Sequence, residues 1–122
     1  MKILDRLTRK AKKDKDILAV ILFGSYARNE SFRDIDACLV LRNDKSDAGK
    51  KKLEYLAEFP DLDIQVFQGL PLYIRTRILK EGKIIFCKDI SKLYDIAIMT
   101  IKDFTYYEPI YREYLEAVLN DR

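Results

Sequence analysis

The sequence predicts an α+β fold that is α/β-like in its alternation, with a small mixed β-sheet of about four strands flanked by helices. Short apolar runs rich in β-branched residues alternate with segments whose apolar residues recur at helical spacing. The chain has no internal repeat, linker or low-complexity segment. Its 122 residues suffice for one compact domain but not for two ordinary ones, so residues 1–122 are predicted to form a single domain.

The chain is predicted to begin with a helix, a buried strand and a short helical turn. Residues 2–13 carry apolar side chains at helical spacing, which indicates an amphipathic helix. Residues 17–23 form a continuous apolar run ended by Gly24, which is typical of a strand buried on both faces. Residues 25–28 predict one helical turn, and Asn29 can end it because Asn tolerates a left-handed conformation.

The middle of the chain predicts two strands separated by a helix. The segment "DIDACLVL", residues 34–41, predicts the second strand, and "LDIQVF", residues 62–67, predicts the third. Between them, residues 46–59 predict a helix that ends at Pro60. The buried stripe of this helix is predicted to consist of Leu53, Leu56, Ala57 and Phe59.

The last third of the chain is predicted to be mostly helical. A helix is predicted to start near Pro71, a residue favoured in a first turn, and to stop at Gly82. Residues 83–87 predict a short fourth strand. From Ser91 the pattern is helical to the end, and Pro109 either kinks one helix or starts another.

Composition narrows the classes of function. No apolar run approaches the roughly 18 residues of a membrane span, and the Lys-rich start lacks a secretory signal, so a cytoplasmic protein without a membrane partner is expected. The net charge of +3 is mild and dispersed, which argues against a nucleic-acid partner. Cys38 and Cys87 are predicted to be buried, reduced thiols. Histidine is absent, so any chemistry must use carboxylates, hydroxyls, cations and bound metal.

The most informative feature is a pair of carboxylates inside the second predicted strand. Side chains alternate across a strand, so Asp34 and Asp36 should point to one face, with Cα atoms about 6.6 Å apart. Two carboxylates so placed repel each other and lose hydration if that face is dry. A divalent cation resolves both costs, and hard oxygen ligands suit Mg²⁺. The pair therefore predicts a metal site.

Two other Asp-x-Asp pairs occur, and only one adds to this site. Asp14 and Asp16 lie in a Lys-rich connector and predict a solvated turn. Asp61 follows Pro60 and suits a turn as well. Asp63 instead lies between apolar residues at the start of the third strand, so it can join the first pair if the two strands are neighbours. Three converging carboxylates are typical of a two-metal site for phosphoryl displacement.

Gly24 and Ser25 supply the complementary part of a phosphate site. A strand that turns sharply into a helix start exposes backbone N–H groups, and these bind phosphate. Glycine lets the backbone come close to a ligand, and the Ser25 hydroxyl can donate to a phosphate oxygen.

The segment "FGSYARNESFRDIDACLV" resembles the signature of the minimal nucleotidyltransferases, small relatives in the DNA polymerase β superfamily. The resemblance implies a palm-like core in which Gly24 and Ser25 form the phosphate turn. It also implies that Asp34, Asp36 and Asp63 are catalytic and bind two Mg²⁺ ions. Arg28 is a candidate nucleotide contact by the same resemblance.

The resemblance implies transfer of a nucleoside monophosphate, with AMP from ATP favoured over other NTPs, to an acceptor hydroxyl. Relatives of this kind pair with small helical HEPN proteins, as antitoxins that adenylylate a tyrosine of the toxin. Two alternatives stay open: the same transfer to an RNA end or a small molecule, and a non-catalytic antitoxin that only binds its partner. A homo-oligomer is also left open, and the Tyr-rich C-terminal segment is a candidate docking surface.

Overall fold

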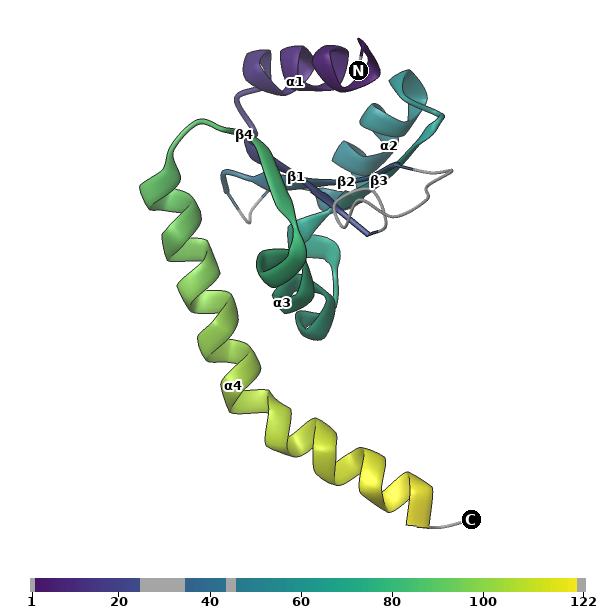
Figure 1. The fold of residues 1–122 in the computed structure, drawn as a ribbon, viewed down its shortest axis with the longest axis vertical. Helices are drawn as coiled ribbons and strands as arrows, with labels where there is room; N and C mark the ends of the chain where they lie inside the picture. The colour runs from purple at the N-terminus through teal and green to yellow at the C-terminus, as the bar shows by residue number, and fades with distance from the viewer. Residues whose placement is uncertain (1, 25–34, 44–45, 121–122) are drawn as a thin grey trace.

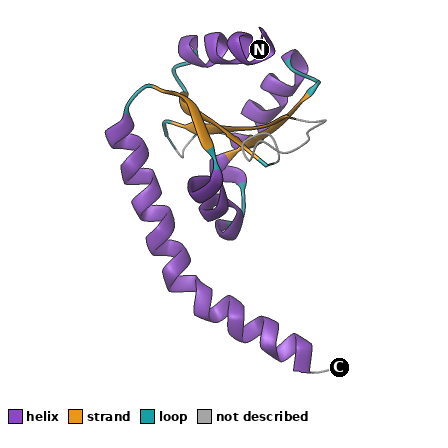
Figure 2. Cartoon of the chain, in the orientation of Figure 1, coloured by secondary structure: helices purple, strands orange, loops and turns teal. Residues whose placement is uncertain are grey.

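The computed structural model describes residues 2–24, 35–43 and 46–120, and these residues form helices on both faces of a mixed sheet (Figure 1, Figure 2). This confirms the predicted α+β class. In chain order the elements are α1 (Lys2–Lys13), β1 (Ile17–Phe23), β2 (Ile35–Leu41), α2 (Ala48–Glu58), β3 (Leu62–Val66), the 3₁₀ turn η1 (Phe67–Gly69), α3 (Leu72–Glu81), β4 (Lys83–Cys87) and α4 (Ile90–Asn120).

Within the described residues the sheet has four strands in the order β3-β2-β1-β4. β1 lies in the centre and pairs antiparallel with β2 on one side and with β4 on the other. β3 pairs parallel with β2, which places the third strand directly beside the strand that carries Asp36. The parallel pair is connected through α2, as parallel strands require a crossover.

Two apolar cores cover the two faces of the sheet. On one face, α1 and α2 pack on side chains that include Val20, Leu39 and Ile64. On the other face, α3 and the start of α4 pack on Ile21, Cys38 and neighbouring residues. Figure 1 shows α1 and α2 on one side of the sheet and α3 on the other. Because both faces are covered, β1 is an almost fully buried apolar strand, as its sequence predicted.

The predicted buried stripe of α2 is wrong in part. Leu53 is 69% exposed and Ala57 is exposed, whereas Tyr55 and Phe59 are buried one helical turn apart. Leu56 lies partly buried against the same core. Tyr55 can occupy the core because its hydroxyl donates to Asp14 at 2.9 Å, which satisfies the polar end of the ring. The helix therefore turns its aromatic face inward.

The prediction that Asp14 lies in a solvated turn is also wrong. Its side chain is only 14% exposed, and Lys51 Nζ lies 3.0 Å from its Oδ2. Lys51 also reaches Asp16 Oδ2 at 3.1 Å, and Lys88 Nζ donates to the Asp14 carbonyl. Burial would raise the pKa of Asp14, but hydrogen bonds from the Asp16 N–H, Lys51 and Tyr55 outweigh it and lower that pKa below 3.8. The carboxylate joins α1, β1 and α2.

The two cysteines differ in burial. Cys38 is buried in β2, and burial raises the pKa of its thiol, so it is an inert core residue as predicted. Cys87 is only partly buried, and it lies on β4, an edge strand of the sheet. Both are free thiols.

Helix α4 is continuous, with Pro109 inside it, so Pro109 does not start a new helix. The helix bends near its middle (Figure 1), where a proline removes one backbone hydrogen bond and displaces the preceding turn. Its first half lies beside α3, and its second half extends beyond the rest of the fold. No helix in the described ranges is long and apolar enough to cross a membrane.

Candidate active site

Two of the predicted site carboxylates are brought together by strand pairing. Asp36 of β2 and Asp63 of β3 are register partners in the parallel ladder. Neighbouring strands lie about 4.8 Å apart, and side chains in register point to the same face of a sheet. That face is the one on which Cys38 packs against α3 and α4. Asp36 is partly buried and Asp63 is exposed, so the pair lies at the border between core and solvent.

Gly24 lies against the Asp36 carboxylate. Its φ of +75° is in the left-handed region that favours glycine. A Cβ at this position would also collide with Oδ2 of Asp36. Two independent constraints therefore exclude a side chain here, one from the backbone angle and one from the carboxylate. The result is a bare backbone turn at the end of β1 in direct contact with a site carboxylate.

Three predicted site residues lie outside the described part of the chain. They are Ser25, Arg28 and Asp34. The predicted helical turn at residues 25–28 and its end at Asn29 lie outside it as well. The roles assigned to these residues rest on the sequence alone and remain predictions.

Asp63 has a neighbour that sequence reasoning missed. Gln65, two residues further along β3 and on the same face, donates from Nε2 to Asp63 Oδ1 at 3.2 Å. Lys52 of α2 donates in turn to Gln65 Oε1 at 3.2 Å. The chain Lys52–Gln65–Asp63 holds one carboxylate oxygen and leaves the other for a ligand. The alternation Asp-x-Gln along a strand was the available signal for Gln65, whereas nothing in the sequence indicated Lys52.

A cavity of about 260 Å³ adjoins Gly24 on the same side of the sheet. Its lining comes from the end of β1 and from one side of α3: Phe23, Gly24, Ile74, Arg77, Ile78 and Glu81. Arg77 and Glu81 form an ion pair at 3.8 Å across one helical turn. Arg77 places a cation beside the glycine turn. This residue was not predicted from the sequence. The cavity offers apolar walls and a cation next to the glycine turn that contacts Asp36.

The donor set fits a hard divalent cation. The Asp36 and Asp63 carboxylates supply oxygen donors from adjacent strands, which Mg²⁺ prefers over nitrogen or sulfur. The described residues contain no group of three acidic, Cys or His side chains placed to hold a metal. The third predicted donor, Asp34, is not among those residues. Chemically, paired carboxylates beside a glycine turn suit phosphoryl or nucleotidyl transfer.

A protein-family model matches most of the chain. The family described as "Polymerase beta, Nucleotidyltransferase" matches residues 5–91, which include both strands of the carboxylate pair. The chain is also 40% identical over 76 residues to a protein of Methanocaldococcus jannaschii provisionally named a protein adenylyltransferase. That alignment spans 57% of this chain and 56% of the relative, so it covers little more than half of either.

Solved structures show the same fold at low identity. One is a toxin–antitoxin complex with AMP-PNP, of which a chain is 15% identical to this one, with a TM-score of 0.72 and 97% of each chain covered. Another is a tri-AMPylated HEPN toxin of Shewanella oneidensis in complex with its MNT antitoxin. There the identity is 15%, the TM-score is 0.70, and coverage is 97% of this chain and 94% of the other.

Proposed function

Because the chain belongs to the polymerase beta nucleotidyltransferase family, we propose that it moves AMP from ATP to a tyrosine hydroxyl of a small helical HEPN-type partner. On this proposal it is an antitoxin, and residues 1–122 form one minimal nucleotidyltransferase domain. Two similarities support the acceptor. The Methanocaldococcus jannaschii relative carries the name of a protein adenylyltransferase, and a structural neighbour contains an AMPylated HEPN toxin.

The observation that carries the proposal is the contact of three backbone segments at one point. Asp36 and Asp63 are in register across β2 and β3, and Gly24 packs on the Asp36 carboxylate. In the proposed site these two carboxylates and Asp34 hold two Mg²⁺ ions. The Gly24–Ser25 turn binds the triphosphate through backbone N–H groups and the serine hydroxyl, and Arg28 adds a nucleotide contact.

The proposed reaction is an in-line displacement at the α-phosphorus of ATP. The acceptor oxygen forms a bond to that phosphorus, the bond to the bridging oxygen breaks, and pyrophosphate leaves. Bound Mg²⁺ neutralises charge on the phosphates. Asp63 takes up the proton of the acceptor hydroxyl, directly or through water, because it is the more exposed carboxylate and lies on the outer strand. Gln65 keeps its carboxylate oriented.

The test is transfer of label from ATP labelled at the α-phosphate, with Mg²⁺ and lysate of the native host, followed by identification of the labelled species. We expect label on a tyrosine of a small helical protein. The Asp36→Asn variant should give no label, and Asp61→Asn, two residues before Asp63 in an exposed turn, should label like the wild type. Label on RNA or on a small molecule would contradict the proposed acceptor while leaving nucleotidyl transfer intact.

A further inference from the structure

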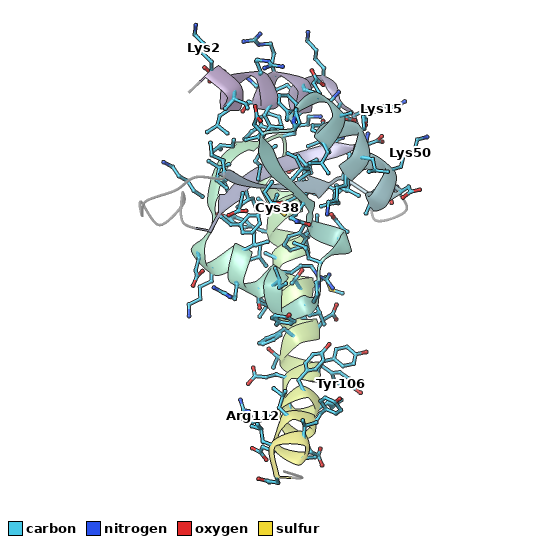
Figure 3. All side chains as sticks on the ribbon, turned by 90° about the vertical axis from the view of Figure 1, so that its right-hand side faces the viewer. Lys2, Lys15, Cys38, Lys50, Tyr106 and Arg112 are labelled. Carbon is cyan, nitrogen blue, oxygen red and sulfur yellow. The ribbon has the colours of Figure 1, made fainter. Side chains whose placement is uncertain are left out.

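The second half of α4 is a helix without a covering partner among the described residues. It extends beyond the sheet and α3, and Tyr106 and Arg112 mark it in Figure 3. We call residues 104–120 the tail. Eight of its large apolar side chains are between 43% and 70% exposed: Tyr106, Tyr107, Ile110, Tyr111, Tyr114, Leu115, Val118 and Leu119. Most helical stability in proteins comes from packing of an apolar face, so this tail needs a surface to pack against.

The exposed apolar area of the tail is large enough for a protein–protein interface. Eight large side chains that are each about half exposed present on the order of 800 Å² per copy, which is what one side of a standard interface buries. The tail is also acidic. Its Glu108, Glu113 and Glu116 outnumber its one basic residue, Arg112, which gives a net charge of −2. Glu108 pairs with Arg112, whereas Glu113 and Glu116 have no ion-pair partner within the described ranges.

A cationic cavity of about 560 Å³ lies next to the first half of the same helix. Its cations are Arg42, Arg75 and Lys92, and its one acidic residue is Asp103, so its net charge is +2. Its apolar lining includes Phe67, Ile96 and Met99. None of the three cations forms an ion pair with another described residue, and the Nε of Arg75 is buried without a hydrogen-bond acceptor among them.

One wall and the floor of the cavity are held by hydrogen bonds and packing. Gln68 in its wall accepts a hydrogen bond from the Leu41 N–H at 3.0 Å and donates to the Leu41 carbonyl at 2.9 Å. Phe67 is 1% exposed, and the Arg75 guanidinium lies 6.0 Å from the centre of its ring. The wall at Gln68 and the floor at Phe67 are therefore formed by the fold itself, and Arg75 lies over that floor, whereas Arg42 and Lys92 are exposed at the rim.

The tail and the cavity are complementary in charge and both are apolar, yet one chain cannot bring its own two parts together because α4 is continuous between them. We propose that a second copy of this chain joins them, through an antiparallel pairing of the two α4 helices about a two-fold axis. Such an axis near residue 105 places residues 107–118 of each copy alongside residues 92–103 of the other. Each tail then covers the cavity of its partner, and the same contact forms twice, as an isologous interface requires.

The test is the solution mass of the full chain by sedimentation and by light scattering over a concentration series. We expect a dimer of the 14.4 kDa chain at micromolar concentration, which dissociates more as salt is added because the contact includes exposed charges. A wild-type chain that stays monomeric throughout the series would overturn the proposal.

Charge reversal makes the test specific. The cavity variant carries Arg75→Glu and Lys92→Glu, and the tail variant carries Glu113→Lys and Glu116→Lys. Each variant alone places like charges at both contacts, so its dimer dissociation constant should rise at least about tenfold. A matched control with Lys13→Glu and Lys50→Glu, two exposed cations of α1 and α2, should dimerise like the wild type.

A mixture of the cavity variant and the tail variant tests the contact most specifically. In a mixed pair each cavity again meets a tail of opposite charge, so equal amounts of the two monomeric variants should form a heterodimer. Circular dichroism of each variant checks that it is folded. Dimers that persist in either variant alone, or a mixture that stays monomeric, would overturn the tail-in-cavity contact. The measurement involves neither ATP nor an acceptor, so its outcome is independent of the proposed enzymatic function.

Discussion

Asp36 and Asp63 stand side by side as register partners on the only parallel strand pair among the described residues. They lie 27 residues apart in the chain, and the α2 crossover brings them together. The turn at Gly24 then closes on Asp36 from the antiparallel side. A glycine turn and two carboxylates thus meet where the central strand ends.

The first prediction concerns Gly24. Gly24→Ala should abolish nucleotidyl transfer and lower the free energy of unfolding by about 1–2 kcal/mol, because alanine is strained at φ +75° and its Cβ collides with the Asp36 carboxylate. Denaturant unfolding and a transfer assay measure the two effects. The control is Gly49→Ala in α2, where a Cβ meets only Asp47 Oδ1 at 3.5 Å, and stability should stay equal or rise. Full activity in Gly24→Ala would show that the contact is dispensable.

The second prediction is cooperative binding of ATP and Mg²⁺. If the carboxylates and the glycine turn form one site, ATP with Mg²⁺ should raise the melting temperature more than either does alone, by mass action on the folded state.

Ser25→Ala should weaken triphosphate affinity by about 1 kcal/mol for one lost hydrogen bond, with the fold intact. Calorimetry measures the affinity. Equal triphosphate affinity in the wild type and in Ser25→Ala would contradict a phosphate contact of the Ser25 hydroxyl.

The third prediction concerns the buried link between Tyr55 and Asp14. Tyr55→Phe removes the hydroxyl that donates to the Asp14 carboxylate and should lower the free energy of unfolding by about 1 kcal/mol. The matched control is Tyr73→Phe, since Tyr73 is 55% exposed and should tolerate the change. Nucleotide affinity should not change in either variant. Equal stability of the two variants would contradict a structural role for the Tyr55 hydroxyl.

The fourth prediction is a pH dependence of stability that comes from Asp14. Its pKa is lowered in the folded protein, so its contribution is fully present above its ordinary value of 3.8 and is lost as the pH falls through the folded value. In Asp14→Asn the slope of unfolding free energy against pH below about 4 should be smaller than in the wild type. Denaturant unfolding at a series of pH values measures it. Asp16→Asn is the control, because that side chain is 43% exposed.

Most of the secondary structure could be predicted because it depends on local patterns. The apolar run of β1, the proline and glycine at the two ends of α3, and the periodicity of α4 each lie within a short window. Proline left two outcomes open at Pro109, since a kinked helix and a new helix share one local pattern. In the structure, Pro109 lies inside one continuous helix, α4.

The errors have a common physical cause, which is contact between distant residues. Tyr55 is buried because Asp14, 41 residues away, accepts its hydroxyl hydrogen, and Asp14 is shielded because Lys51, 37 residues away, covers it. Periodicity cannot detect such contacts, so the helical spacing of apolar residues alone predicts a buried stripe that includes Leu53 and omits Tyr55. The same cause limits prediction of the candidate site. Asp36 and Asp63 are neighbours only because the strand order is β3-β2-β1-β4, and local patterns do not determine that order.

The most direct test of the proposed function separates Asp63 from Asp36. Calorimetric Mg·ATP binding and AMP transfer should be measured together for Asp63→Asn and Asp36→Asn, with Asp61→Asn as the control in the adjacent exposed turn. We expect Asp36→Asn to lose both binding and transfer. Asp63→Asn should keep much of the Mg·ATP affinity and lose nearly all transfer, because in the proposed mechanism the Asp63 carboxylate takes up the proton of the acceptor hydroxyl. Transfer by Asp63→Asn at the wild-type rate would contradict the carboxylate site.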